Sequence, residues 1–294
     1  MYYYIINPAS GLGKINKIQD KLKETLHSLG IDGEFVKTTG PGDAARLVNM
    51  GLEKGYKTII AVGGDETVNE IINALAAKKS DAVLGVIPIG QENNLAKMLG
   101  ISDWQDAAKI IASRKLEDLD LGKIKLAQRD YFFVTTANVG FETKLIGKRE
   151  QLGRVGKILY YRKLISQLLS YRPNEFLIIF DDKFEVRGKF FNVACYNVKL
   201  GTSKLKTNPK DEKFDVLVVP KQSARNLIFA AKAILKGEYD LLSDVSVFRA
   251  KKVKIESEKE AKVSVDGQIL GKTPAELWVT KEKLKAIVGK ERKF

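Results

Sequence analysis

Residues 58–70, Thr-Ile-Ile-Ala-Val-Gly-Gly-Asp-Glu-Thr-Val-Asn-Glu, constrain the fold more than any other stretch of the chain. A β-branched run predicts a buried strand, a double glycine ends it, and a helical stretch follows from 68 to 77. Glycine lets the backbone bend sharply and approach a ligand closely. The start of the following helix offers free N–H groups and the positive end of a dipole, which suits phosphate. The segment therefore predicts a tight phosphate-binding turn that contains Asp65 and Thr67.

The first 120 residues alternate predicted strands with predicted helices. Strands are expected over 2–6, 33–38, 58–62 and 83–87, and helices over 15–29, 42–54, 68–77 and from residue 91 to Gly100. Such alternation indicates a parallel sheet covered on both faces. Ligands of these sheets lie beyond the carboxyl ends of the strands. The turns that fall on that edge are 7–11, 38–42, 63–67 and 88–94.

Short predicted strands dominate the chain after residues 119–122, which we interpret as a linker. The strands are expected over 124–127, 131–137, 176–180, 184–186, 189–196, 214–219, 246–249, 252–256, 262–265 and 276–279, with helices over 157–170 and 224–236. This pattern is typical of an antiparallel sandwich or open barrel. We therefore expect an α/β domain over 1–122 with a Rossmann-like nucleotide site and a mainly antiparallel β-sandwich domain over 123–294. The last strand is a candidate for returning to the first domain.

The charge of the chain points to an anionic partner. Lys and Arg number 50 against 36 Asp and Glu, which gives a net charge of +14 and suits a nucleotide, a nucleic acid or an acidic membrane. Nucleic acid is disfavoured because no basic motif interleaved with aromatics is present. The basic run 149–163 is a candidate membrane contact. With a single cysteine, Cys195, and no long apolar span, we expect a cytoplasmic, peripherally membrane-associated protein. A homodimer is left open.

Seven segments, in order along the chain, carry recognisable motifs. They are 7–11, Thr38 with 42–45, 63–70, 88–96, 138–142, 211–215 and 265–268. In these segments the chain resembles the diacylglycerol kinase catalytic family, which includes bacterial lipid kinases and the sphingosine and ceramide kinases. Residues 63–70 match Gly-Gly-Asp-Gly-Thr-x-Asn-Glu at every position but one. Residues 88–96 are similar to Pro-x-Gly-Thr-Gly-Asn-Asp-Phe-Ala.

The resemblance implies an activity and a set of site residues. It implies transfer of the γ-phosphoryl group from ATP, with Mg²⁺, to a lipid hydroxyl of the diacylglycerol type at an anionic membrane surface. The implied nucleotide-binding residues are Asn7, Pro8, Ser10, Gly11, Thr38, Gly63, Gly64, Asp65, Glu66, Thr67, Asn69, Glu70, Gly90, Gln91 and Asn93. The implied metal ligands are Asp211 and Asp215, and the implied catalytic residues are Asp65, Asp266 and Gln268.

The departures from the family pattern cluster at the chemistry. Gln268 stands where the family has a glutamate base, and a carboxamide takes no proton at neutral pH. Losing a general base typically costs about 10²–10⁴ in rate. Glu66 and Glu92 replace phosphate-loop glycines. A carboxylate about 5 Å from a phosphate repels it by about 3 kcal/mol at an effective dielectric of about 20.

These departures leave three hypotheses open. The chain is a kinase with weakened turnover, or a catalytically inactive relative that binds lipid or nucleotide, or a kinase with an altered donor or acceptor. In the third case Glu66 and Glu92 would contact a ribose, a sugar or a metal.

A third glycine replacement, Glu212, lies in the predicted metal segment. At Glu66, Glu92 and Glu212 we expect a backbone with positive φ, which costs a residue other than glycine about 1 kcal/mol.

Overall fold

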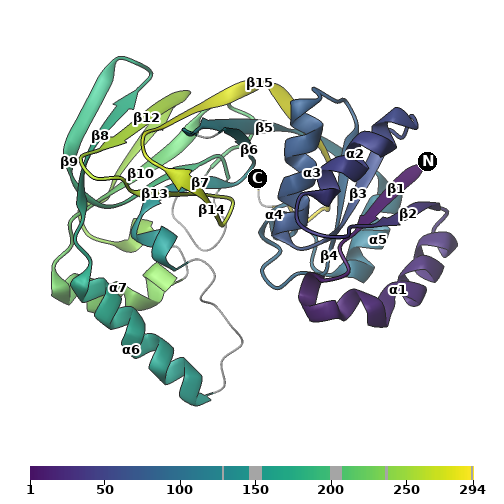
Figure 1. Cartoon of the computed structure of the whole chain (residues 1–294), viewed down its shortest axis with the longest axis horizontal. Coiled ribbons are helices and arrows are strands. Elements are labelled where there is room, and N and C mark those ends of the chain that lie inside the picture. Colours follow the sequence, from purple (N-terminus) through teal and green to yellow (C-terminus); the bar gives the residue numbers. More distant parts are fainter. Residues whose placement is uncertain (128, 146–153, 199–206, 236–237, 293) are drawn as a thin grey trace. The chain divides into compact units, whose positions relative to one another are not determined.

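The computed structural model describes residues 1–127, 129–145, 154–198, 207–235, 238–292 and 294 (Figure 1). The chain divides into two compact units. The first consists of Met1–Leu121, Phe132–Val134 and Thr280–Phe294, and the second of Gly122–Tyr131 and Thr135–Val279. The predicted basic run 149–163 lies outside the described residues over 149–153. No helix in the described ranges is long and apolar enough to cross a membrane.

The first unit is built on parallel strands, as the alternating pattern predicts. They lie in the order β4 (Val83–Pro88), β3 (Thr58–Gly63), β1 (Tyr2–Ile6), β2 (Gly33–Lys37). Every residue of β3 and β4 is buried. A strand buried on both faces needs an uninterrupted apolar run, which explains the sequence of residues 58–63. The end of β15 (Ala275–Ile287) joins the same sheet through Ala286, paired in parallel with Leu84.

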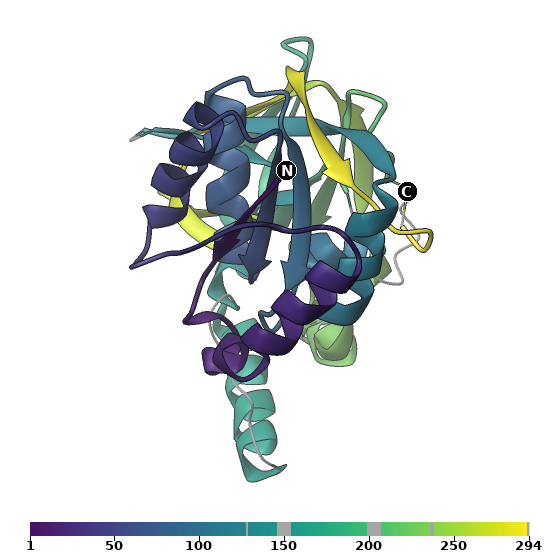
Figure 2. The same ribbon diagram turned by 90° about the vertical axis from the view of Figure 1, so that its right-hand side faces the viewer.

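Helices cover both faces of this sheet. In Figure 2, α2 (Asp43–Glu53) and α3 (Asp65–Ala77) lie on one face, and α1 (Ser10–Ser28) and α5 (Trp104–Ser113) on the other. The helix expected up to Gly100 is shorter, α4 (Asn94–Met98), and α5 was not predicted. The sequence nevertheless contains a signal for the start of α5. The side chain of Asp103 accepts a hydrogen bond from the backbone N–H of Asp106 and caps the helix.

The second unit is mainly antiparallel. Its strands include β7 (Thr136–Gly140), β8 (Asn174–Phe180), β9 (Phe184–Tyr196), β10 (Phe214–Pro220), β11 (Ser246–Ala250), β12 (Lys252–Ser257), β13 (Lys262–Val265) and β14 (Gln268–Lys272). Each pairing among them is antiparallel, and β12 also pairs with the start of β15. The expected α/β and β-sandwich classes are confirmed.

Two helices and two short 3₁₀ turns accompany these strands in the part of the second unit that the structure describes. They are α6 (Arg154–Ser170), α7 (Ala224–Leu235), η1 (Phe141–Lys144) and η2 (Tyr239–Leu241). Leu164 and Leu168 of α6 share a buried cluster with Leu227 of α7 and Ala194 of β9. Cys195, the next residue of β9, is fully buried as predicted, and burial raises the pKa of its thiol to about 12.

Several predicted boundaries in the second half of the chain are wrong. The linker expected at 119–122 lies inside β5 (Leu116–Lys125), which also contains the start of the strand expected at 124–127. The single strand expected at 131–137 is two, β6 (Asp130–Phe133) and β7. The strands expected at 184–186 and 189–196 are one, β9, and 276–279 is part of the longer β15. Gly188 lies inside β9, where an added Cβ would be 3.2 Å from the ring of Phe190.

Candidate functional site

Three loops meet at the carboxyl ends of β1, β3 and β4. The Asn7 side-chain amide donates to Thr67 Oγ1 at 2.9 Å, which joins the end of β1 to the start of α3. The hydroxyl of Ser10 accepts from the backbone N–H of Gly64 at 3.3 Å. The carbonyl of Gly63 accepts from the backbone N–H of Ile89 at 2.9 Å. The predicted segments 7–11, 63–70 and 88–96 are thus brought together.

Glycine is required where these loops touch. A Cβ on Gly90 would lie 2.5 Å from the Cα of Gly64 and 2.8 Å from the side-chain oxygen of Asn93. A Cβ on Gly11, whose φ is +60°, would lie 2.2 Å from the carbonyl oxygen of Ile89. Real Cβ atoms do not approach other atoms so closely, so these positions require glycine for the loop packing itself.

The turn expected at Asp65 is already helical. Gly64 is extended, with φ −98° and ψ −175°, and α3 begins at Asp65. One extended glycine makes the whole change of direction, so Asp65, Glu66 and Thr67 form the first turn rather than a preceding loop. The negative side chains of Asp65 and Glu66 suit the positive end of the helix dipole. Thr67 is buried at 3% exposure.

Asp65 connects α3 to α4. Its Oδ1 accepts from the backbone N–H of Leu95, and its Oδ2 from the side-chain amide of Asn94, each at 3.4 Å. Asn93, next to Asn94, has a left-handed backbone with φ 51°, and its amide donates to the carbonyl of Gly90 at 2.8 Å. Asn94 belongs to the motif 88–96 but is not among the implied nucleotide-binding residues, although it stands beside Asn93, which is.

The expected backbone strain is absent at the two phosphate-loop glutamates. Glu66 and Glu92 are exposed, and neither has a positive φ. Glu66 adopts the helical conformation of the first turn of α3, where any residue fits. At Glu212 the expectation holds, because its φ is +56°. The obstacle that Glu66 and Glu92 present to a phosphate is therefore charge and not conformation.

The loop after β2 is held from two sides. The carboxylate of Glu70 accepts from the backbone N–H of Gly42 at 2.9 Å. Two hydrogen bonds to the Asp43 carboxylate lower its pKa to about 2. The larger effect comes from the Arg46 guanidinium and the smaller one from the backbone N–H of Thr39. Asp43 belongs to the motif 42–45, but its pairing with Arg46 was not predicted, and the spacing of three residues on one helix is the available signal. Thr38, which precedes this loop, is buried.

The remaining predicted residues of the first unit surround these contacts. Pro8 and Asn69 are half-buried, and Gln91 is exposed. Asn69 lies in α3, where its carbonyl accepts from the amide of Asn73 at 2.9 Å. Asn73 also exchanges two hydrogen bonds with the backbone of Phe132, at 2.8 and 3.0 Å. The amide of Asn73 thus secures the short segment 132–134 in the first unit.

Asp266 and Gln268 lie in the second unit, on the β13–β14 hairpin. Asp266 and Gly267 both have positive φ, 44° and 85°, as a two-residue type I′ turn requires, and Gln268 pairs with Val265. The Oδ1 of Asp266 accepts from the backbone N–H groups of Thr135 and Thr136, at 3.0 and 2.9 Å, and from the Thr135 hydroxyl. These bonds lie at the point where β6 and β7 separate.

Asp211 and Asp215, the predicted metal ligands, share an arginine. The Arg249 guanidinium pairs with both carboxylates, and its Nε lies 3.4 Å from Asp215 Oδ1. Burial raises the pKa of Asp215, and Arg249 opposes that shift. Among the residues that the structure describes, no group of three metal-ligating side chains occurs. This arrangement fits the guanidinium and does not fit a Mg²⁺ ion beside it, because the two cations would repel each other.

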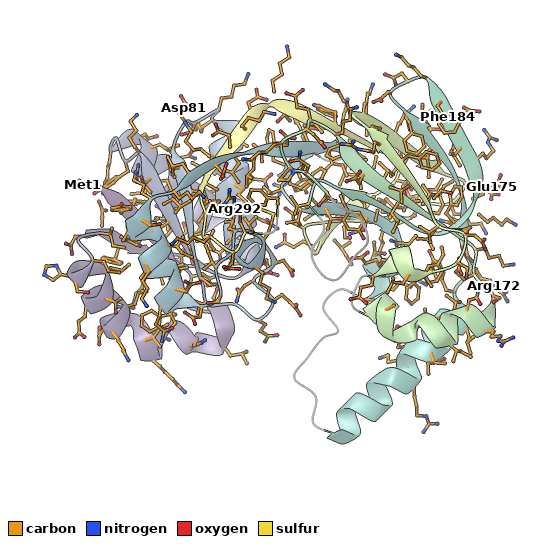
Figure 3. The ribbon with its side chains drawn as sticks, turned by 180° about the vertical axis from the view of Figure 1, so that it is seen from behind. Met1, Asp81, Arg172, Glu175, Phe184 and Arg292 are labelled. Carbon is orange, nitrogen blue, oxygen red and sulfur yellow. The ribbon has the colours of Figure 1, made fainter. Side chains whose placement is uncertain are left out.

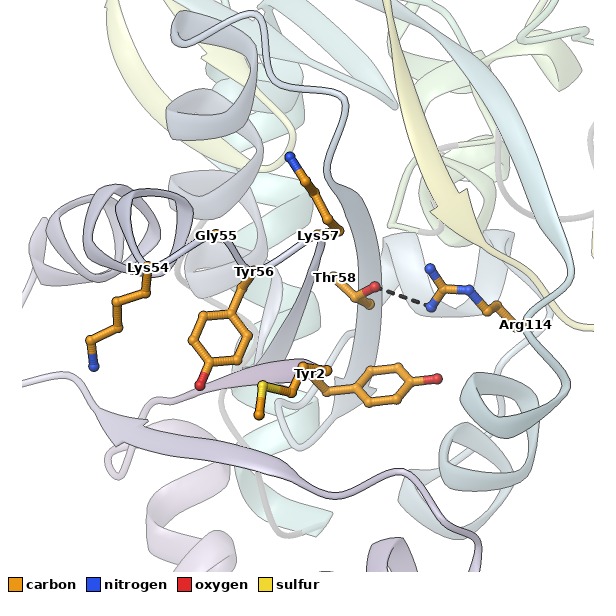
Figure 4. A pocket seen from close by; sticks show the side chains of 8 residues that line it. Tyr2, Lys54, Gly55, Tyr56, Lys57, Thr58 and Arg114 are labelled. Carbon is orange, nitrogen blue, oxygen red and sulfur yellow. Dashed lines mark hydrogen bonds between the residues drawn. The ribbon is translucent and has the colours of Figure 1, made fainter.

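A pocket of about 460 Å³ lies at the opposite edge of the first sheet, where β1 and β3 begin (Figure 4). Its lining residues are Met1, Tyr2, Lys54, Gly55, Tyr56, Lys57, Thr58 and Arg114. Arg114 donates to Thr58 Oγ1 at 3.1 Å. Lys54 and Arg114 follow the carboxyl ends of α2 and α5, where cations complement the helix dipoles. None of the predicted site residues lines this pocket.

Comparison with known proteins places the chain in a family. The diacylglycerol kinase catalytic domain family matches residues 1–124, and the YegS C-terminal NAD kinase beta sandwich-like domain family matches residues 137–288. A Bacillus subtilis protein named diacylglycerol kinase is 28% identical over 297 residues, covering 98% of this chain and 96% of its own. A Staphylococcus saprophyticus diacylglycerol kinase is also 28% identical, covering 92% and 89%.

Solved structures share the fold. A diacylglycerol kinase crystal structure from Bacillus anthracis has a TM-score of 0.74 at 21% identity, covering 99% of this chain and 97% of that one. An NAD kinase from Archaeoglobus fulgidus, solved in complex with ATP, has a TM-score of 0.56 at 14% identity, covering 100% of this chain and 96% of that one.

Proposed function

Since this chain belongs to the diacylglycerol kinase catalytic-domain family, we propose that it is an ATP-dependent lipid kinase acting on a diacylglycerol-type hydroxyl. The observation that carries the proposal is the meeting of three loops at one edge of the parallel sheet. Asn7, Ser10 and Asp65 each bond from one of the three segments to another there. Close backbone approach beside a helix start is the usual way to hold a phosphate chain.

The nucleotide's phosphate chain would lie along Gly64 and Gly90, beside the start of α3. Mg²⁺ usually reaches such sites bound to the phosphates and to one or two carboxylates, with its remaining positions filled by water. It would neutralise charge developing on the transferred group. Asp65 is the carboxylate we assign to this metal. Glu66, in the first turn of α3, and Glu92, in the loop after β4, add exposed negative charge, which lowers the affinity for a nucleotide without metal.

The acceptor side of the reaction is assigned to the β13–β14 hairpin. Gln268 takes no proton, and Asp266 is the remaining candidate base, although its Oδ1 already accepts three hydrogen bonds. Phosphoryl transfer depends mostly on positioning and charge stabilisation, so slow turnover survives the loss of a strong base. We expect a rate about 10²–10⁴ below that of a member with a glutamate at residue 268.

Transfer from labelled ATP to dioctanoylglycerol in mixed micelles tests the proposal. Asp65→Asn keeps the size of the side chain and removes its charge, so turnover should fall below detection. Asp81→Asn is the matched control (Figure 3), because Asp81 is exposed just before β4, at the other edge of the sheet. Equal turnover in the Asp65→Asn variant and the parent protein would refute the assignment.

A second candidate function is binding without transfer, and Gln268 with Glu66 and Glu92 favours it. Gln268→Glu separates the two. In a weakened kinase the restored carboxylate raises turnover about 10²-fold or more. In a binding protein the same substitution leaves turnover undetectable, while calorimetry still reports lipid or nucleotide binding.

We further propose that the protein works at an anionic membrane surface. The net charge of +14 supports this, since each basic residue near an anionic leaflet contributes about 1 kcal/mol. Cosedimentation with vesicles that contain phosphatidylserine should fall steeply as salt is raised. Binding that is equal on neutral vesicles, or independent of salt, would contradict an electrostatic attachment.

A further inference from the structure

One pocket of the first unit has no role in the function proposed above. It is the cavity of about 460 Å³ at the edge of the sheet where β1 and β3 begin (Figure 4). The loops assigned to the phosphate chain follow the other ends of these strands. β1 has five residues, so its two ends lie roughly 15 Å apart. The pocket has the size of a small-molecule site and is separate from the proposed nucleotide site.

Arg114 is held at the wall of this pocket by two contacts. It donates a hydrogen bond to Thr58 Oγ1 at 3.1 Å, and its guanidinium carbon lies 5.9 Å from the centre of the Tyr2 ring. Thr58 is 2% exposed and gives the guanidinium a fixed anchor. A guanidinium has several N–H donors in one rigid plane, so the bond to Thr58 leaves others for a ligand. Arg114 is therefore oriented before a ligand binds.

The backbone of Arg114 adopts a conformation that favours glycine. Arg114 directly follows α5 and is left-handed, with φ 51° and ψ 36°. Helices usually place glycine in this conformation, because a Cβ makes it costly. The other helix end at the pocket does so, since Gly55 after α2 has φ 84°. Residues in costly conformations cluster at ligand-binding positions. A requirement for the Arg114 side chain explains an arginine at this place.

The pocket carries two cations that no carboxylate neutralises. Lys54 is not one of them, because its ammonium nitrogen lies 2.6 Å from Glu34 Oε1. Arg114 and Lys57 have no acidic partner among the residues that the structure describes, and no residue lining the pocket is acidic. The carbonyl ends of α2 and α5 contribute about −0.5 charge each, which leaves the pocket positive. Such a pocket attracts a carboxylate or a phosphate.

Aromatic rings supply the apolar part of the lining. Tyr2 and Tyr56 are both half-buried. The Tyr56 ring packs against Tyr3, with ring centres 4.9 Å apart, and its hydroxyl donates to Glu34 at 3.0 Å. These contacts fix the ring, and a fixed ring surface suits a flat apolar body. An inorganic anion would match the cations alone, and an uncharged aromatic molecule would match the rings alone.

We infer that this pocket binds a small aromatic anion. Arg114 and Lys57 contact its carboxylate or phosphate group, and Tyr56 contacts its ring. The inference goes beyond the proposed kinase function and does not depend on it.

Calorimetric titration of the full chain with phenyl phosphate and with benzoate, without ATP or Mg²⁺, tests the inference. At least one of them should bind saturably, and the tighter one identifies the anionic group. Benzamide has the ring without the charge, and inorganic phosphate has the charge without the ring. Each should bind about ten-fold more weakly or less. No binding of either aromatic anion at about 10 mM, or equal binding of benzamide or inorganic phosphate, would overturn the inference.

Arg114→Gly separates binding from stability. The glycine relieves the left-handed backbone and loses the bond to Thr58, so the melting temperature should stay within about 2 °C of the parent value. The affinity for the aromatic anion should fall about ten-fold or more. A lower melting temperature with unchanged affinity would mean that Arg114 only stabilises the end of α5, and would overturn the inference.

Two further variants keep the test independent of one substitution. Lys57→Ala removes an exposed cation of the pocket and should also weaken binding. Lys115→Ala is the matched control, because Lys115 is exposed beside Arg114 but does not line the pocket. It should leave the affinity unchanged. Parent-like affinity in Lys57→Ala, or equal weakening in Lys115→Ala, would overturn the inference.

The nucleotide titration distinguishes the two sites. Arg114→Gly should leave the binding of ATP with Mg²⁺ unchanged, and Asp65→Asn should leave the binding of the aromatic anion unchanged. Loss of aromatic anion binding in the Asp65→Asn variant would place that ligand at the phosphate loops and overturn the inference. Failure of the kinase proposal looks different, because the parent protein then transfers no phosphoryl group while the aromatic anion still binds.

Discussion

Gly90→Ala should disrupt the first unit at the meeting point of its loops. The added Cβ would lie 2.5 Å from the Cα of Gly64, whereas nonbonded carbon atoms prefer about 3.5–4.0 Å. The loops must therefore separate by about 1 Å or more. Overpacking of this kind typically costs about 1–3 kcal/mol.

The neighbouring loop supplies a matched control. An added Cβ on Gly40 meets nothing within 4 Å, and Gly40 has no positive φ. Gly40→Ala should leave stability unchanged or raise it by about 0.4–1 kcal/mol, because alanine restricts the unfolded chain more than glycine does. The difference in stability between Gly90→Ala and Gly40→Ala therefore measures the effect of the close approach of the two loops, without the general effect of replacing a glycine.

Urea unfolding followed by tryptophan fluorescence measures the difference. With a slope of about 2 kcal/mol per molar urea, a cost of 2 kcal/mol lowers the midpoint by about 1 M. Calorimetry should also show weaker ATP binding for Gly90→Ala, because the separated loops no longer fit one phosphate chain. Similar midpoints and affinities for Gly90→Ala and Gly40→Ala would show that the close approach of Gly64 and Gly90 does not require glycine.

Two more changes test the energetics of the fold. Glu212→Gly relieves a left-handed backbone conformation that costs glutamate about 1 kcal/mol. About half of this gain is cancelled, because glycine makes the unfolded chain more flexible and so favours unfolding. We expect a stability gain of about 0.5 kcal/mol in urea unfolding, and a loss for Glu258→Gly, which has no positive φ to relieve. Asp43 has its pKa lowered from 3.8 to about 2 in the folded state. Its contribution is therefore complete above 3.8 and is lost as the pH falls through about 2. Asp43→Asn should flatten the decline in stability over that interval, and an unchanged pH profile would contradict the assigned hydrogen bonds.

The parallel half of the fold was predictable because its signals are local. Strands buried on both faces need continuous apolar runs, and residues 58–62 and 83–87 carry them. The loops that follow these strands must share one edge of a parallel sheet, so the meeting of Asn7, Gly64 and Gly90 could be expected. The shift in the start of α3 has a different cause. Gly64 turns the chain in one residue, and nothing in the sequence distinguishes that from a longer turn.

The second half was less predictable because distant residues decide its local structure. Residues 131–137 indicate one strand, but the carboxylate of Asp266, far along the chain, accepts from Thr135 and Thr136 at the point where β6 and β7 separate. Arg249 pairs with the two predicted metal ligands from a strand about 35 residues away, and no spacing rule relates them.

Glu66 and Glu92 show what the structure adds to a motif. The sequence gives two reasons to doubt nucleotide binding, namely strain and charge. The structure removes the first, since neither residue has a positive φ. The second remains, because both side chains are exposed, Glu66 in the first turn of α3 and Glu92 in the loop after β4. Charge is also the term that Mg²⁺ can offset, so metal dependence becomes the deciding property.

Calorimetric titration with ATP, with and without Mg²⁺, decides whether the loops after β1, β3 and β4 hold a nucleotide. We expect saturable binding that requires Mg²⁺, because the metal offsets the repulsion from Glu66 and Glu92, and we expect this binding to be lost in the Asp65→Asn variant. No binding at millimolar ATP in the presence of Mg²⁺ would contradict the claim that the loops after β1, β3 and β4 hold a nucleotide.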